Sequence, residues 1–502
     1  MKAKKEHRAQ INILTTLLRQ LVATICGIVI PRLMIGAFGS VVYGATTSIA
    51  QFLAYISLFE GGIGRVARGA LYKPLSRNDS KEISCVYSEI KRFFKNIGIL
   101  FLLYAIILAI FYYDIADVIV LSRQYTFGLV IAISLSTFAS YMGGIANMTL
   151  LHADQKQYLT NTIIMVTYVM NMLSIVILVK ADADVMTVKL ISSLVFIARP
   201  ILYSYFVKRG YDLTKEKGKT NVLSQKWTGM GQHVAYFLHT NTDVVLLTLF
   251  ADLKYVAVYS IYHLIVNSIW NIASSFAGGM EAALGEMVAK GEKSKIVISY
   301  RGYKALLTLV AILLFGTTAS LLVPFVRLYT AGVSDANYIH PLFGMLLIVA
   351  EAMNCIALPC CTLPISANCL KETKWGSYGE AVINIVLSLL LIRWNPLLGV
   401  AIGTLCATTF KCIYYIIYSA RHILSCSVRH LIRHFISSIT LLVIIGVAGM
   451  AIFQYISISS YIAWAGYGVI VVLLVGCIAT LYGAATFPQE VKLLANRWRR
   501  SI

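Results

Sequence analysis

Charged residues are scarce in this chain. Only 13% of its 502 residues are Asp, Glu, Lys or Arg, about half the share found in soluble domains. Hydrophobic residues make up 58%, and apolar stretches of roughly 20 residues, the length a helix needs to cross a bilayer, recur throughout the chain. The scarcity of charge therefore excludes an ordinary soluble protein and predicts an all-α, polytopic membrane protein.

The chain also lacks the usual signatures of metal, cofactor and catalytic sites. Its ten cysteines contain no C-x-x-C pair and no zinc-ligand spacing, which favours small apolar packing residues. Residues 218–220 read Gly-Lys-Thr, but a phosphate-binding loop needs a glycine at position 213, which is Leu. The acidic pair Asp182 and Asp184 lies on a very short loop and is interpreted as solvated. We predict no metal, no cofactor and no catalytic residue.

The basic N-terminus is not followed by a short apolar core with a small-residue cleavage site. The first apolar segment is therefore interpreted as a retained transmembrane helix rather than a signal peptide. About fourteen transmembrane helices are predicted, at 13–35, 41–62, 96–113, 125–147, 158–180, 187–207, 230–251, 254–276, 304–326, 339–362, 376–394, 397–418, 435–456 and 462–484.

Acidic residues are few beside the basic ones: 22 against 43, a net charge of +21. With both termini placed in the cytoplasm, 33 of the Lys and Arg residues fall on cytoplasmic segments and 6 on external segments or outer helix ends. Short loops rich in Lys and Arg stay cytoplasmic, and one missed helix would invert every later loop. The positive charge is thus assigned to topology and lipid headgroups, not nucleic acid. The external loops are too short for an extracytoplasmic domain.

Two stretches suggest an internal repeat. Residues 38–49 read FGSVVYGATTSI and residues 250–261 read FADLKYVAVYSI, with five identities in register, each across a short external turn. A step of six helices preserves orientation, so the two halves are predicted to be parallel repeats. The predicted organisation is an N-lobe at 1–210 (helices 1–6), a cytoplasmic linker at 211–229, a C-lobe at 230–430 (helices 7–12), and helices 13–14 with a basic tail at 431–502.

Eight charged residues fall inside predicted helices. Each would cost roughly 2.5–3.5 kcal/mol near the centre of a lipid-facing helix, so they are expected to face a protein interior or a watery cavity, or to snorkel to an interface. For each of them, a structural pair and a functional role both stay open. The cations are Arg19, Arg32, Arg199 and Lys411, and the acids are Glu60, Asp243, Glu351 and Glu380.

One pair has helical spacing. His239 and Asp243 are four residues apart and therefore on one helix face. Such a pair is suited to binding a proton, and a satisfied buried hydrogen bond is the alternative. Pro31 precedes Arg32 and Pro200 follows Arg199, so each proline either opens the backbone beside a cation or simply kinks its helix.

A series of short motifs resembles one transporter family. The series comprises Pro31-Arg32-Leu33 with Gly36, Phe38-Gly39, Tyr43-Gly44, the run 58–64 (LFEGGIG), 242–246 (TDVVL), 255–259 (YVAVY), Leu363-Pro364 with Ala367 and Lys371, 384–386 (NIV) and 398–401 (LGVA). In this order the motifs resemble the polysaccharide flippases, the O-antigen and repeat-unit translocases of the superfamily that includes multidrug and toxin extrusion transporters. The resemblance covers about residues 11–420. Many members have Asp or Asn where this chain has Glu60.

The resemblance implies a non-enzymatic flippase of the bacterial cytoplasmic membrane that moves a polyprenyl-pyrophosphate-linked oligosaccharide by alternating access. Its implied partners are this lipid-linked substrate, membrane lipid, and polysaccharide polymerase and chain-length proteins. Arg19, Arg32, Arg199 and Lys411 would give the cavity between the lobes a cationic character suited to pyrophosphate. The candidates for ion coupling are Glu60, His239, Asp243, Glu351 and Glu380.

Three alternatives stay open at this point. A multidrug exporter of the same superfamily and a peptidoglycan-precursor flippase would share the architecture. A membrane polysaccharide polymerase or glycosyltransferase is the alternative from another class, but such enzymes typically need a sizeable external loop, which this chain lacks.

Overall fold

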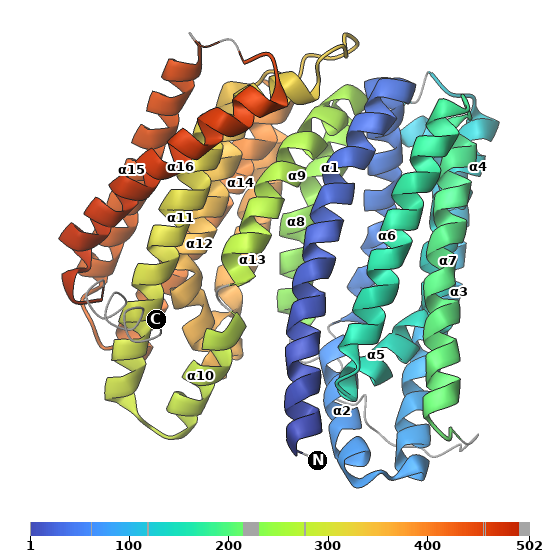
Figure 1. Cartoon of the computed structure of the whole chain (residues 1–502), viewed down its shortest axis with the longest axis horizontal. Helices are drawn as coiled ribbons and strands as arrows, with labels where there is room; N and C mark the ends of the chain where they lie inside the picture. The colour runs from blue at the N-terminus through green and yellow to red at the C-terminus, as the bar shows by residue number, and fades with distance from the viewer. Residues whose placement is uncertain are drawn as a thin grey trace. The chain divides into compact units, whose positions relative to one another are not determined.

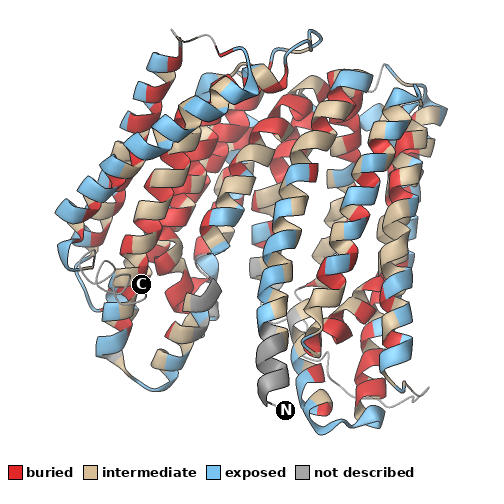
Figure 2. Cartoon of the chain, in the orientation of Figure 1, coloured by how far each residue is buried: buried red, intermediate tan, exposed pale blue. Residues whose placement is uncertain are grey.

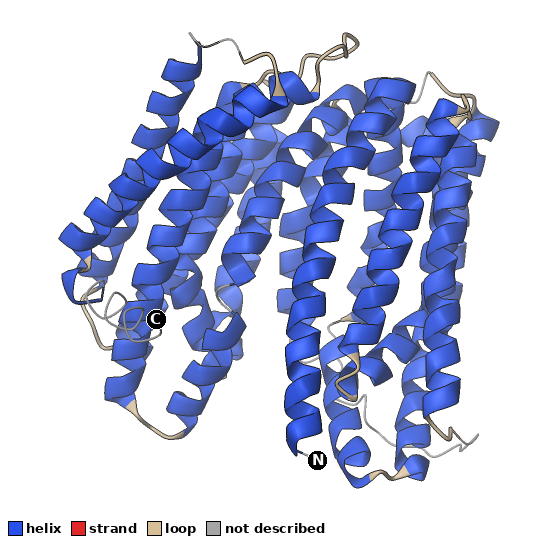
Figure 3. Cartoon of the chain, in the orientation of Figure 1, coloured by secondary structure: helices blue, strands red, loops and turns tan. Residues whose placement is uncertain are grey.

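The computed structural model describes residues 2–61, 63–117, 120–213, 230–275, 278–454, 456 and 458–490. These residues form helices joined by short loops and contain no β-strand (Figure 3). Most of the predicted linker, including the Gly-Lys-Thr sequence at 218–220, and the end of the basic tail lie outside the described residues. The predicted all-α fold is confirmed.

Eleven helices of the described residues are long and apolar enough to cross a membrane. The first of them, Gln10–Glu60, covers predicted helices 1 and 2. Predicted helices 7 and 11 correspond to α8 (Met230–Phe250) and α13 (Leu370–Leu391), which are not among the eleven. The other predicted helices match the remaining candidates one to one. Predicted helices 7 and 11 are the ones that carry Asp243 and Glu380.

The chain forms two compact units, each described here by itself. Unit 1 comprises Met1–Phe237 and Asp252–Ala257, and unit 2 comprises Leu238–Ala251 and Val258–Ile502. Helices α8 and α9 (Leu253–Ser275) contribute to both units. The lobe boundaries at 210 and 230 stay a prediction.

The remaining helices follow in chain order (Figure 1). Unit 1 contains α1 (Lys2–Ala54), η1 (Tyr55–Glu60), α2 (Ile63–Arg77), α3 (Ser80–Ile115), α4 (Arg123–Ala139), η2 (Ser140–Gly144), α5 (Ile145–Ala153), α6 (Gln157–Lys180) and α7 (Val185–Gly210). Unit 2 contains α10 (Gly278–Ala289), α11 (Lys293–Tyr329), α12 (Pro341–Ser366), α14 (Pro396–Tyr418), η4 (Ser419–Ile423), α15 (Val428–Gln454) and α16 (Tyr461–Thr486).

The first two predicted helices are the two halves of α1. Gly39 breaks the helix with φ 80° and ψ 170°, a backbone conformation that L side chains rarely adopt, so α1 consists of two helical segments that meet there. The second segment packs against α3, whose Tyr104 and Tyr112 hydroxyls donate to backbone carbonyls at Phe52 (2.7 Å) and Ala45 (3.2 Å). A single glycine therefore separates the two predicted spans.

Two predicted cytoplasmic loops, 63–95 and 277–304, are largely helical. Helices α2 and α10 form within them, and α3 and α11 begin at Ser80 and Lys293, well before the predicted spans. Asp79 caps α3 by accepting from the Lys81 and Glu82 amides at 3.1 and 3.0 Å. The difference arises because charge marks where a helix leaves the bilayer, whereas a helix continues into water until its hydrogen bonding ends.

Figure 2 shows exposed residues along the outer faces of helices such as α16 and buried residues along faces turned toward neighbouring helices. Many of the exposed residues are large and apolar. On α16, Ile462 is 87% exposed and Leu481 is 71% exposed. Such faces are unfavourable in water and suited to lipid. This distribution agrees with a multi-pass membrane protein.

Close packing of α15 on α11 depends on glycine. A Cβ atom at Gly449 would lie 2.8 Å from the Ser320 Cα atom, and one at Gly446 would lie 2.9 Å from the Ala319 Cβ atom. Next to this contact, Ile312, Ile445, Val475 and Ala479 form a buried cluster that joins α11, α15 and α16. Small residues let helix backbones approach closely, which is the main source of helix association in lipid.

Replacing Gly449 with Ala is therefore expected to destabilise the chain by about 1–3 kcal/mol, because the added methyl overpacks against backbone. The matched control is Gly466→Ala on α16, where a Cβ atom has no neighbour within 4 Å. That variant should gain up to about 1 kcal/mol from helix propensity. The thermal unfolding temperatures of the purified variants in detergent test the opposite signs; equal shifts of both variants would contradict the packing argument.

Candidate functional site

Unit 2 contains a cluster of polar and ionisable side chains that lie between its helices and are largely buried. Five helices contribute to it: α8, α9, α12, α13 and α14. Asp243 and Glu380 are each 3% exposed, and His239 is 8% exposed. The members are His239, Asp243, Tyr259, Glu351, Asn354, Glu380, Asn384, Thr404 and Lys411.

Two glycines of α14 bring that helix against α13. A Cβ atom at Gly399 would lie 2.7 Å from the Ile392 amide nitrogen, and one at Gly403 would lie 2.2 Å from the Ser388 hydroxyl. These glycines are four residues apart and so occupy one face of α14. Their close approach places Thr404 beside Asn384, whose Nδ2 donates to the Thr404 Oγ1 at 2.9 Å.

Glu380 is the centre of the charged part of the cluster. Its Oε1 accepts from the Lys411 Nζ at 2.9 Å and lies 3.3 Å from the His239 Nε2. The Lys411 Nζ also donates to the Asn354 Oδ1 at 3.3 Å, and the Asn354 Nδ2 donates to the Glu351 Oε2 at 3.2 Å. A continuous chain of polar contacts thus runs from α8 to α12, and the Lys411 ammonium offsets part of the cost of burying two carboxyls.

Asp243 belongs to the same cluster, but its hydrogen-bond partners are uncharged hydroxyl groups. Its Oδ2 accepts from the Tyr259 and Thr404 hydroxyls, both at 2.9 Å. Its Oδ1 is buried and has no hydrogen-bond partner within 3.5 Å, as is also true of the His239 Nδ1. A buried acceptor without a donor is costly unless a proton, ion or water satisfies it.

A cavity of about 40 Å³ opens between these groups, with walls that include His239, Asp243, Tyr259, Glu351 and Thr404. That is room for a water molecule or a small ion but not for an organic ligand. With three acids against one lysine in the cluster, such a cavity favours positive charge. Among the described residues, no group of three or more His, Cys, Asp or Glu side chains has the arrangement of a metal site.

The i, i+4 pair predicted on α8 has a different geometry from the one its spacing suggests. His239 contacts Glu380 on α13, and Asp243 contacts Tyr259 and Thr404 on α9 and α14. Sharing a helix face did not decide the partner, because each side chain instead contacts a neighbouring helix. The proton-binding role of these residues stays a prediction.

Unit 1 holds the other intramembrane cations, which are half-buried. The Arg199 guanidinium lies between two aromatic rings, with its Cζ 4.7 Å from the Tyr168 centroid and 4.3 Å from the Phe196 centroid. Its Nε donates to the Thr167 hydroxyl at 2.7 Å, and one terminal nitrogen is buried without a hydrogen-bond partner. The Arg19 Nε is likewise buried without one. Among the described residues, the ion pairs within 4.0 Å include neither arginine.

The remaining predicted residues belong to unit 1. Glu60 ends η1, and its Oε1 accepts a hydrogen bond from the Tyr141 hydroxyl on η2. Arg32 is half-buried in the first half of α1, one helical turn before Gly36. Pro200, beside Arg199, packs against Gly144 of η2, where an added Cβ atom would lie 2.9 Å from the proline Cβ. This proline is thus at a close helix contact.

The acidic pair between α6 and α7 has a structural role at Asp184. The Thr187 hydroxyl and the Tyr125 hydroxyl both donate to this carboxylate, and they lower its pKa. Tyr125 also accepts from the Met186 amide at 3.0 Å. The hydrogen bond between Tyr125 of α4 and Asp184 therefore connects the start of α7 to α4.

Sequence reasoning missed Tyr259, Thr404, Asn384 and Asn354, which connect the charged residues. A signal for one of them exists in the sequence: Glu380, Asn384 and Ser388 recur at intervals of four, forming a polar stripe on α13. Similar spacing holds for two more: Tyr259 lies four residues from both Tyr255 and His263 on α9, and Asn354 lies three residues after Glu351 on α12.

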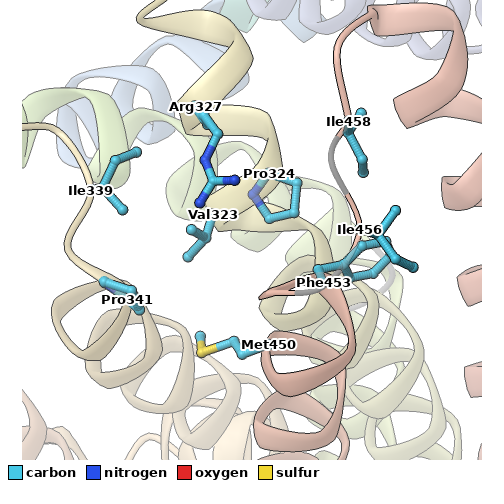
Figure 4. Close-up of a pocket in the computed structure, with 9 residues that line it drawn as sticks. All are labelled: Val323, Pro324, Arg327, Ile339, Pro341, Met450, Phe453, Ile456 and Ile458. Carbon is cyan, nitrogen blue, oxygen red and sulfur yellow. The ribbon is translucent and has the colours of Figure 1, made fainter.

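A second cavity, of about 160 Å³, lies elsewhere in unit 2 and is mainly apolar. In Figure 4 the Arg327 side chain extends from α11 toward its centre, with Met450 and Phe453 of α15 on the facing side. The complete lining is Val323, Pro324, Arg327, Ile339, Pro341, Met450, Phe453, Ile456 and Ile458. Its lining contains no Asp or Glu, so its chemistry differs from that of the polar cluster.

Comparison with known proteins identifies the fold. No family model matches the chain, and no curated protein matches it in sequence. The lipid II flippase MurJ, in its inward closed conformation, has a TM-score of 0.66 at 12% identity, covering 95% of this chain and 99% of MurJ.

Two multidrug transporters are also similar. The MATE multidrug transporter DinF-BH has a TM-score of 0.57 at 16% identity, covering 85% of this chain and 96% of its own. An inward-facing multidrug resistance MATE family transporter of the MOP superfamily has a TM-score of 0.59 at 13% identity, covering 83% and 98%. The protein therefore belongs to the class of multi-pass, all-α membrane proteins. Its particular fold is the one shared by MurJ and the MATE transporters.

Proposed function

We propose that this protein is a flippase that moves polyprenyl-pyrophosphate-linked oligosaccharide repeat units across the bacterial cytoplasmic membrane by alternating access. Its product would supply surface polysaccharide assembly, such as O-antigen or capsule. The observation that carries the proposal is the fold, which is similar to that of a lipid II flippase over 95% of the chain. The order of motifs along residues 11–420 supports a lipid-linked sugar as the cargo.

The cations of unit 1 support an anionic headgroup. Arg199 is fixed by two aromatic rings and a threonine, yet it retains a buried nitrogen without an acceptor. A phosphate oxygen is the acceptor that a guanidinium binds most strongly. One such contact at 4 Å is worth about 4 kcal/mol at an effective dielectric constant near 20, enough to offset part of the dehydration of a pyrophosphate.

The cluster of unit 2 supports ion coupling. Asp243, Glu351 and Glu380 lie around or beside a cavity of about 40 Å³, the size for a proton-carrying water or a small cation. We propose that a proton or sodium ion exchanged at these carboxyls drives the conformational cycle.

We also propose that both termini lie in the cytoplasm, and that a polysaccharide polymerase and chain-length proteins are partners.

The test is translocation by the purified chain in liposomes. A fluorescent polyprenyl-pyrophosphate oligosaccharide is placed in the outer leaflet, and its loss of access to a membrane-impermeant quencher is followed with time. Wild-type protein should translocate it, and Arg199→Gln should slow translocation by at least about tenfold, because part of the electrostatic stabilisation is lost. Arg393→Gln, which changes a cation just after α13, is the matched control and should keep the wild-type rate.

The same liposomes distinguish the competing functions. If the oligosaccharide lipid stays outside while lipid II crosses, the protein is a flippase of another headgroup. If only a cationic fluorescent dye is moved, the protein is a multidrug exporter. The latter has structural support of its own, because the multidrug transporter DinF-BH has a similar fold and the unit 2 cluster has an excess of acids.

A further inference from the structure

A basic pocket lies at the end of unit 2 that the charge distribution predicts to face the cytoplasm. Its volume is about 280 Å³, and α11, α15 and the segment after α16 form its walls. We define the basic pocket by Arg301 and Lys304 of α11, His430 and His434 of α15, and Phe487 with Glu490 beyond α16. None of these residues belongs to the cluster around Glu380.

Aromatic contacts fix the shape of the basic pocket. The Lys304 Nζ lies 5.3 Å above the Phe487 ring, and the His434 ring stacks on the same phenyl with centroids 5.5 Å apart. The Nε2 atoms of His430 and His434 are 3.0 Å apart. Phe487 is only 5% exposed, so this side of the pocket is held by packing.

The basic pocket contains two cations, Arg301 and Lys304, against one acid, Glu490. Among the described residues, the ion pairs within 4.0 Å include neither Arg301 nor Lys304, although Glu490 lines the same pocket. Arg429 and Arg433 lie on the adjoining surface of α15. Helix α15 begins at Val428, which adds the positive end of a helix dipole. These features together favour a bound anion.

The neighbouring surface is apolar. Ile436 is 57% exposed and Ile444 is 59% exposed, and their spacing of eight positions places them on the same face of α15. A surface with cations at one end and exposed apolar side chains along the helix matches a molecule with a phosphate head and hydrocarbon chains. Basic pockets between transmembrane helices on the cytoplasmic side bind such headgroups.

We propose that the basic pocket binds an anionic phospholipid of the cytoplasmic leaflet, with its phosphate at Arg301 and Lys304 and its acyl chains along α15. Its residues are distinct from Arg199 and from the cluster around Glu380, and the inference stands whether or not the protein is a flippase.

The test is lipid binding to the full-length, delipidated protein, measured by native mass spectrometry. Phosphatidylglycerol and phosphatidylcholine with identical acyl chains are titrated in parallel. Wild-type protein should prefer phosphatidylglycerol, and Arg301→Gln/Lys304→Gln should weaken its binding by about 25-fold, since each cation contributes about fivefold. Arg327→Gln, which removes an exposed cation from the other end of α11, should retain wild-type binding.

Two further variants keep the test decisive. Arg301→Lys/Lys304→Arg retains both charges and should bind phosphatidylglycerol as the wild type does. Arg301→Gln alone changes an exposed side chain, so it should fold, and it should show about a fivefold loss. Wild-type affinity in both glutamine variants would overturn the proposal. So would displacement of the lipid by millimolar glycerol phosphate, which would assign the pocket to a soluble phosphate compound.

Discussion

Replacing Lys411 with Met is expected to lower the free energy of unfolding by about 3–5 kcal/mol, because it leaves the Glu380 carboxylate buried without its ammonium partner. Glu380 would retain only the His239 imidazole, at 3.3 Å. Lys411 also donates to the Asn354 Oδ1, so Asn354, whose Nδ2 donates to Glu351, would lose one of its hydrogen bonds at the same time. The measurement is the thermal unfolding temperature of the purified variants in detergent.

A double-mutant cycle separates the ion pair from simple loss of packing. Lys411→Met/Glu380→Gln removes both charges and is expected to be destabilised by less than the sum of the single variants, with a coupling above about 1 kcal/mol. Lys371→Met, which changes an exposed lysine on α13, is the matched control and should shift stability by less than about 0.5 kcal/mol. If Lys411→Met unfolded at the same temperature as Lys371→Met, the pair would have no structural role.

Replacing Asp243 with Asn is expected to abolish the dependence of translocation on ion gradients while leaving insertion and folding intact. Asn has nearly the same shape, and its carbonyl can still accept from Tyr259 and Thr404, but it cannot change charge. One elementary charge moved across 100 mV is worth about 2.3 kcal/mol, or roughly 50-fold in an equilibrium constant. Transport into liposomes, measured with and without imposed proton or sodium gradients, gives the comparison.

The control for this variant is Asp252→Asn. Asp252 precedes α9 and accepts from the Lys254 amide at 2.8 Å, and Asn caps a helix as well as Asp does. The control should therefore respond to gradients as the wild type does. Should translocation by Asp243→Asn follow the gradients unchanged, the coupling ion does not bind at this carboxyl. The flippase proposal itself would still be tested by the Arg199 experiment.

Much of the fold could be predicted because hydropathy and length act locally. Each apolar stretch must form a helix in a bilayer, since no other open structure satisfies its backbone groups there. Helix ends were less predictable: α3 begins at Ser80, whereas the predicted span begins at 96, because a charged sequence does not interrupt helical hydrogen bonding. At Gly39, in contrast, one span ends and the next begins because of the backbone conformation of this residue, with no charged residue at the boundary.

Hydropathy and charge were enough to establish an all-α, multi-pass membrane protein and to identify the ionisable residues that must avoid lipid. Those properties follow from composition and from the cost of charge in hydrocarbon, which depend on no distant contact. The partners of these residues came from the packed helices: His239 and Lys411 contact Glu380, Asp243 contacts Tyr259 and Thr404, and Arg199 lies between two rings. A partner in space depends on which helix faces pack together, and here close contacts at small residues such as Gly403 set that packing.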